Sequence, residues 1–107
     1  MRIGVPTEIK PNEHRVGLVP LSVKELTSKG HNVFVEAGAG RGIAASDEEY
    51  VEAGAEILNT AEAVFQQAQM IVKVKEPQPT EWARLRANQI LFTYLHLAAD
   101  TEQASGL

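Results

Sequence analysis

The sequence predicts an α/β fold: a parallel sheet of about four or more strands with helices on both faces, as in Rossmann-like and flavodoxin-like three-layer sandwiches. Three observations support this prediction. Strand-like and helix-like segments alternate along the 107 residues, which is typical of parallel sheets. The segment 70–74 is almost continuously apolar, which indicates burial on both faces. Stiff, proline-containing loops follow the first and third strands, where α/β proteins commonly place ligand sites.

The first half of the chain is expected to form two strands, 1–6 and 32–36, and two helices. The first helix is predicted by apolar residues at helical spacing, a proline near its start and a glycine after its end. These residues are Val19, Val23, Leu26, Pro20 and Gly30. Ser46 and Glu49 fit a capping box, which predicts a short helix over about 47–53.

The second half is expected to continue the alternation with two more strands, 70–74 and 90–95. Helices are expected before, between and after these strands, because a capping residue or a possible helix start precedes each of them. They should begin near Thr60, Thr80 and Asp100. With this order the strands run parallel and the helices cover the sheet.

Composition limits the classes of protein to which the chain can belong. At this length one domain is expected, and a net charge of -4 disfavours nucleic acid and anionic membranes as partners. The absence of cysteine excludes a disulfide scaffold and a thiolate metal site. No apolar run approaches the roughly 18 residues needed to span a bilayer. We therefore expect a cytoplasmic domain that binds no metal, nucleic acid or membrane.

Three candidate site residues lie at or just beyond strand ends. Arg15 lies in the loop after the first strand, Lys75 follows the third, and His96 follows the fourth. The carboxyl ends of parallel strands share one edge of a sheet, so these side chains are expected to converge there. A guanidinium matches a carboxylate, an ammonium can polarise a carbonyl oxygen, and an imidazole transfers protons near pH 7. Together these groups suit a 2-oxo acid or a 2-amino acid.

Each of these residues also has an ordinary structural explanation. A loop arginine is usually solvated, a lysine at a strand end usually extends to water, and a histidine after an apolar strand is often a hydrogen-bonded structural residue. Lys73 lies inside the third strand, and we expect an edge or end position that leaves its ammonium in water. Glu8, Glu13 and Glu76 lie near the cations in the sequence. They are either ion-pair partners or solvated surface charges, and we expect the latter.

The glycine-rich segment 38–43 invites a nucleotide-binding interpretation, which we reject. The dinucleotide fingerprint requires glycines at its first, third and sixth positions, and Ile43 occupies the sixth. No long helix opens there either, since the next helix starts late, at Ser46. We therefore expect a turn, and no cofactor-binding residue in this chain.

Several segments, taken in order, resemble the N-terminal part of alanine dehydrogenase. The opening of the chain is similar to that family's first signature, and a glycine-containing segment is similar to its second. Two later segments are similar to its active-site strands. The similar segments are 1–10, 13–20, 35–40, 71–77 and 92–98. The resemblance covers the whole chain in register.

The resemblance implies an activity: the reversible oxidative deamination of L-alanine to pyruvate and ammonium, with NAD as the hydride acceptor. By match to the family's motifs, Arg15 and Lys75 bind the carboxylate and the carbonyl oxygen of the substrate. His96 is implied to be the general acid/base, so that Lys75 and His96 form the catalytic set. Tyr94 is implied to line the substrate pocket, although a core position would explain this tyrosine equally well.

The wider superfamily leaves two alternatives open. The NAD-binding subunit of proton-translocating transhydrogenase shares much of the opening signature and the glycine turn. That subunit usually has an asparagine in place of Lys75 and no histidine matching His96, so these two residues favour the amino acid dehydrogenase. The second alternative is a non-catalytic module that holds a small carboxylate with the same cations.

The family's architecture implies that these 107 residues are one part of an enzyme. Its members have a separate Rossmann domain that binds NAD, after which the chain returns to complete the first domain. We therefore expect residues 1–107 to be the N-terminal substrate and catalytic domain, truncated before the cofactor domain and inactive by itself. Family members are commonly hexamers, so a homo-oligomer is expected of the full-length protein.

Overall fold

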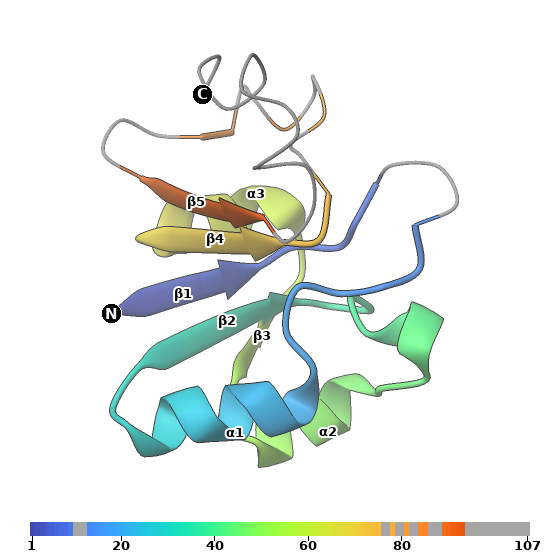
Figure 1. Cartoon of the computed structure of the whole chain (residues 1–107), viewed down its shortest axis with the longest axis vertical. Coiled ribbons are helices and arrows are strands. Elements are labelled where there is room, and N and C mark those ends of the chain that lie inside the picture. The colour runs from blue at the N-terminus through green and yellow to red at the C-terminus, as the bar shows by residue number, and fades with distance from the viewer. Residues whose placement is uncertain (10–12, 76–77, 79–80, 82–83, 86–88, 94–107) are drawn as a thin grey trace.

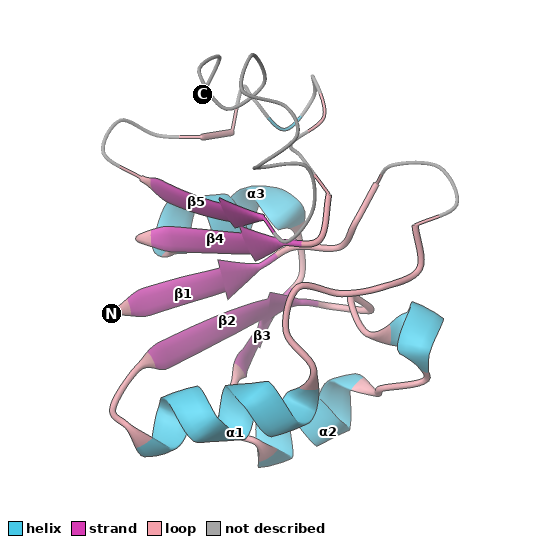
Figure 2. Cartoon of the chain, in the orientation of Figure 1, coloured by secondary structure: helices cyan, strands magenta, loops and turns pink. Residues whose placement is uncertain are grey.

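One parallel sheet organises the fold (Figures 1 and 2). The computed structural model describes residues 1–9, 13–75, 78, 81, 84–85 and 89–93. Among these residues, five strands pair in parallel in the order β3-β2-β1-β4-β5. The strands are β1 (Arg2–Val5), β2 (Asn32–Glu36), β3 (Glu56–Leu58), β4 (Met70–Lys73) and β5 (Ile90–Thr93). The predicted fold class is confirmed, and the strand order is the Rossmann order rather than the flavodoxin-like one.

Helices cover both faces of this sheet, as Figure 1 shows. The helices α1 (Pro20–Ser28) and α2 (Asp47–Glu52) lie on one face, and α3 (Ala61–Gln67) lies on the other. A short 3-10 helix, η1 (Arg41–Ile43), follows the glycine-rich turn. The predicted three-layer arrangement is therefore present in the part of the chain that the structure describes.

The helix starts follow the capping signals of the sequence. The Ser46 hydroxyl accepts a hydrogen bond from the Glu49 backbone N–H, and the Glu49 carboxylate accepts one from the Ser46 backbone N–H. The Thr60 hydroxyl oxygen accepts the backbone N–H of Ala63 at 3.1 Å. These bonds satisfy N–H groups that have no partner inside their own helix, so both predicted starts are confirmed.

The described strands and helices differ from the expected ones at one edge of the sheet. The edge strand β3 was not expected, because three residues between two turn-forming segments carry almost no alternating pattern. The helix expected from Thr80 and the one expected near Asp100 fall largely or wholly outside the described residues. The strand expected over 90–95 is described as far as Thr93.

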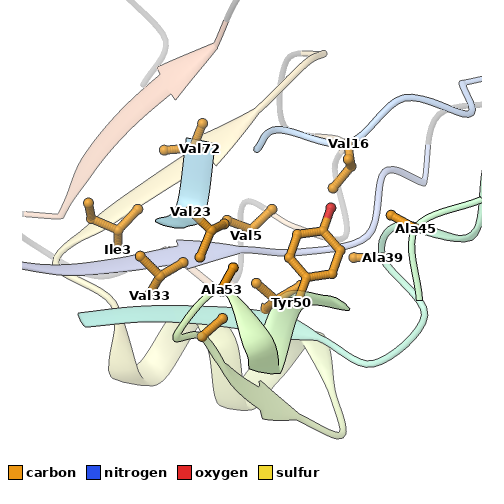
Figure 3. Packing of buried hydrophobic residues seen from close by; sticks show 12 residues of the cluster. Ile3, Val5, Val16, Val23, Val33, Ala39, Ala45, Tyr50, Ala53 and Val72 are labelled. Atoms are coloured by element: carbon orange, nitrogen blue, oxygen red, sulfur yellow. The ribbon is translucent and has the colours of Figure 1, made fainter. Parts of the chain in front are cut away.

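Side chains alternate across the sheet and divide the core into two layers. On the α1 and α2 side, Ile3 and Val5 of β1 and Val72 of β4 join a cluster that includes Tyr50 (Figure 3). On the α3 side, Ile71 of β4 packs with the apolar face of that helix. Tyr50 is fully buried, and its hydroxyl donates to the carbonyl oxygen of Leu18 at 2.8 Å. Desolvation raises the pKa of Tyr50 to about 12, so the hydroxyl remains a donor.

Candidate functional site

The strand order creates one point where the direction of chain progression reverses. From β1 the chain moves outward to β2 and β3, then crosses over to β4 and continues to β5. The loops that leave β1 and β4 therefore diverge, and in sheets of this kind the space between them is where ligands bind. The loop that carries Arg15 and the segment that carries Lys75 follow these two strands.

The loop after β1 is held in place by two close backbone approaches. A Cβ atom on Gly17 would lie 2.3 Å from the carbonyl oxygen of Val72 in β4. A Cβ atom on Gly42 would lie 2.1 Å from the carbonyl oxygen of His14. Both distances are impossible for a side chain, so glycine alone permits this packing. The loop is thus fixed between β4 and the glycine turn, with Arg15 between its two anchors.

Arg15 is oriented by a carboxylate in its own loop. Its Nε and Nη2 atoms each donate to the Glu13 carboxylate at 2.9 Å, and its backbone N–H donates to the same group. The Glu13 side chain is 4% exposed, whereas that of Arg15 is 57% exposed. This geometry leaves the Nη1–Nη2 edge of the fork directed away from Glu13, in the orientation that suits an incoming carboxylate.

The hydrogen bond from the Arg15 side chain is the main reason that the pKa of Glu13 falls from 4.5 to about 2. Burial opposes this shift, while the charges of Arg15 and Lys75 add to it. The charge of Lys75 therefore acts on the same carboxylate that orients Arg15. Hydrogen bonding to Glu13 also raises the pKa of Arg15, with smaller help from the charges of Glu13 and Glu8. The structure places both predicted cations at the carboxyl end of the sheet, where Arg15 alone bonds the Glu13 carboxylate.

Replacing Arg15 with glutamine is expected to move the pKa of Glu13 from about 2 back toward 4.5. Because the folded-state pKa is the lower one, the pair stabilises the fold above about pH 4.5 and loses that effect as the pH falls toward 2. A ¹³C NMR titration of the glutamate carboxyl groups measures the shift. Arg41→Gln is the matched control, and an unchanged Glu13 pKa in Arg15→Gln would contradict the assignment.

Lys75 is held through its backbone by a second carboxylate, that of Glu8 in the loop after β1. Glu8 Oε1 accepts the backbone N–H of Lys75 at 3.2 Å, and Oε2 accepts that of Val74 at 2.9 Å. The carboxylate therefore ties the end of β4 to the loop after β1. The Lys75 side chain begins at this junction and is half-buried.

Lys73 corrects an expectation from the sequence. Its ammonium is not in water: the side chain is 1% exposed, and Nζ lies 3.2 Å from Glu8 Oε1 and 3.1 Å from Glu81 Oε2. Glu81 Oε1 also accepts the backbone N–H of Gln78. The expectation that Glu8 and Glu13 are solvated surface charges is wrong too, since both are ion-pair partners of the cations. Glu76 lies outside the described residues.

A pocket of about 260 Å³ opens beside Glu8, Glu13 and Arg15. The loop after β1 and the glycine turn after β2 form its walls. It is lined by Thr7, Glu8, Glu13, His14, Arg15, Gly38, Ala39, Arg41 and Gly42. Its volume suits a small organic acid, and its lining carries the guanidinium groups of Arg15 and Arg41 beside the carboxylates of Glu8 and Glu13.

The glycine turn is confirmed as a turn, and several of its backbone N–H groups already have acceptors. The backbone N–H of Gly38 already donates to the Asp47 carboxylate at 2.9 Å. Those of Ala39, Arg41 and Ile43 donate to carbonyl oxygens within the turn. Four of the backbone N–H groups of this segment are therefore in use. Among the described residues, no group of three or more His, Asp or Glu side chains could hold a metal ion.

Two predicted site residues, Tyr94 and His96, lie outside the described residues, so their assignment stays a prediction. Sequence reasoning also missed two residues that organise the site. It did not single out Glu81, and it assigned Glu8 to the solvent. A lysine inside an otherwise apolar strand was the available signal, because a buried ammonium requires nearby carboxylates.

A doubly wound parallel sheet, with a small pocket beside the loop after β1, defines a Rossmann-like α/β domain. The chain belongs to the alanine dehydrogenase/PNT family: residues 4–107 match the family model described as "Alanine dehydrogenase/PNT, N-terminal domain". It is 56% identical over 99 residues to the alanine dehydrogenase of Mycolicibacterium smegmatis. The aligned residues cover 92% of this chain and 27% of that protein.

Solved structures agree with this assignment. An L-alanine dehydrogenase structure superposes with a TM-score of 0.88 at 50% identity, covering 97% of this chain and 28% of the other. A transhydrogenase from Sinorhizobium meliloti superposes with a TM-score of 0.87 at 35% identity, covering 99% of this chain and 30% of the other. The chain thus spans less than a third of the length of the relatives it matches. In the part of the chain that the structure describes, no helix is long and apolar enough to cross a membrane.

Proposed function

We propose that this chain is the substrate-binding N-terminal domain of an NAD-dependent alanine dehydrogenase, a cytoplasmic homo-oligomer in its full-length form. The reaction is the reversible conversion of L-alanine, NAD⁺ and water to pyruvate, ammonium, NADH and a proton. The observation that carries the proposal is that Arg15, oriented by Glu13, and Lys75 follow β1 and β4, at the point where the sheet reverses.

Each residue has a distinct task in this proposal. Arg15 holds the substrate carboxylate through the edge of its guanidinium that faces away from Glu13. Lys75 directs its ammonium at the oxygen on the neighbouring carbon, where it stabilises negative charge that develops during the reaction. His96 takes and returns the proton, and Tyr94 lines the pocket. These last two roles rest on motif similarity. NAD is held by a part of the protein outside this chain, which fits the consumed N–H groups of the glycine turn.

The direct test is an assay of the natural protein that carries this chain. We expect NADH formation that depends on L-alanine, and NADH consumption that depends on both pyruvate and ammonium. A protein that shows neither would not be an alanine dehydrogenase. Glycine and L-serine, assayed in parallel, test whether L-alanine is the preferred substrate.

A second candidate function is supported by the transhydrogenase superposition at 35% identity. In that case the protein would transfer hydride between NAD(H) and NADP(H) without need of L-alanine. Lys75 and His96 favour the first candidate. An assay with NADH and an NADP⁺ analogue, without L-alanine, separates the two candidates. Hydride exchange between the nucleotides under these conditions would support the second.

A further inference from the structure

The Glu8 carboxylate accepts three hydrogen bonds beside the candidate site. It accepts the Lys73 ammonium and the backbone N–H of Lys75 on Oε1, and the backbone N–H of Val74 on Oε2. It lies in the loop after β1, yet all three donors lie at the end of β4. Glu8 therefore links the loop after β1 to the segment after β4, the two segments that diverge where the sheet reverses.

The charge balance around Glu8 is unusual for a purely structural ion pair. Glu8, Lys73 and Glu81 are all buried, and two carboxylates share one ammonium. A buried pair would be balanced by Lys73 and Glu81 alone, so the second carboxylate is an addition that a stable core does not need. Its charge is instead compensated by backbone N–H donors at the start of the segment that carries Lys75.

We propose that Glu8 is the positioning residue of the site: it fixes the backbone at Lys75, and thereby the direction from which the Lys75 ammonium meets the substrate, while Lys73 and Glu81 hold Glu8 in place. This inference rests on the proposed function for its substrate and on the contacts of Glu8 for its geometry. Glu8 itself does not react.

A second observation links Glu8 to the other cation of the site. The charge of Glu8 contributes, after that of Glu13, to raising the pKa of Arg15. Glu8 also lines the same pocket as Arg15. One carboxylate thus holds the backbone at Lys75 and also lines the pocket that Arg15 lines.

Glu8→Gln in the natural, full-length protein tests the proposal. The variant keeps the shape of the side chain and leaves Lys73 and Glu81 as a neutral pair, so the fold is expected to survive. The glutamine side chain has one oxygen that accepts and one NH₂ group that can only donate. The NH₂ group would face an N–H donor that the carboxylate now accepts, so the backbone at Lys75 is expected to shift. A displacement of about 1 Å at a reacting group can cost about 100-fold in rate, so we expect kcat/KM for L-alanine to fall about 10- to 100-fold.

A double-mutant cycle separates positioning from a general structural role. If Glu8 acts through Lys75, adding Glu8→Gln to Lys75→Ala lowers the residual kcat/KM by less than about twofold. A loss in that background as large as the loss in the wild-type protein would overturn the proposal. Glu36→Gln is the matched control. Glu36 is the last residue of β2, and its Oε1 accepts the backbone N–H of Thr7 in the loop that also carries Glu8, at 2.8 Å. We expect this control to keep wild-type kinetics.

A crystal structure of Glu8→Gln decides the geometry without reference to activity. The proposal requires the backbone nitrogen of Lys75 to move while the rest of the sheet stays in place. An unmoved Lys75 would overturn it even if turnover fell. A wild-type protein without L-alanine activity would instead reject the proposed function, and the structure of the variant would still decide the role of Glu8.

Discussion

Lys73→Met is expected to be the most destabilising single substitution at this site. Methionine fills a volume similar to that of the lysine side chain, so packing changes little, but Glu8 and Glu81 lose their shared cation while they remain buried. Removing one partner of a buried ion pair typically costs about 3–5 kcal/mol. That is a large part of the roughly 5–15 kcal/mol that stabilises a typical domain.

The effect is measured as the thermal unfolding midpoint of the natural protein, and as its soluble yield. A loss of about 3–5 kcal/mol is expected to lower that midpoint by several degrees or more. Lys24→Met is the control, because Lys24 is an exposed lysine on α1; it should stay within about 0.5 kcal/mol of wild type. If the two variants had the same unfolding midpoint, Lys73 would not be the counter-ion of a buried cluster.

Lys75→Ala is expected to have the largest effect on activity. In the proposed function its ammonium faces an oxygen that gains negative charge during the reaction, and removal of one such donor costs about 10²- to 10³-fold in kcat, or roughly 3–4 kcal/mol. His96→Ala should lower kcat by about 10²- to 10⁴-fold through loss of general acid/base catalysis. Steady-state assays with L-alanine and with pyruvate measure both effects.

The control for Lys75→Ala is Lys29→Ala, which removes an exposed lysine at the end of α1. Its kinetics should equal those of the wild-type protein. Near-normal turnover in Lys75→Ala would remove Lys75 from the catalytic set. A KM that rises while kcat stays constant would instead limit Lys75 to binding, because such an interaction is equally strong before and during the reaction.

The sequence predicts most of the described fold because local signals and burial agree. The strand β2 occupies the expected residues 32–36, and the capping box of α2 forms as expected from Ser46 and Glu49. The strand β3 escapes prediction because its pairing to β2 is decided by tertiary contact rather than by its own three residues. Local propensity cannot supply that information.

The site is less predictable from sequence, because its organisation depends on contacts between distant residues. Arg15 and Lys75 could be proposed from their positions at strand ends and from family motifs. The partners of Lys73 could not, since Glu8 is 65 positions away in the sequence and Glu81 belongs to a different connection. A pattern with a period of two residues shows which face a side chain occupies, but not which loop supplies its counter-ion.

The close approach at Gly42 has a consequence for natural variation and for engineering. Gly42 is exposed, and exposure ordinarily marks positions where a surface can be redesigned freely. Here a backbone carbonyl of the facing loop occupies the volume that any side chain would need, so even alanine would push the two loops apart. A library that diversifies this surface to change substrate preference should leave Gly42 untouched and place its variation at the neighbouring Arg41, whose side chain lines the pocket.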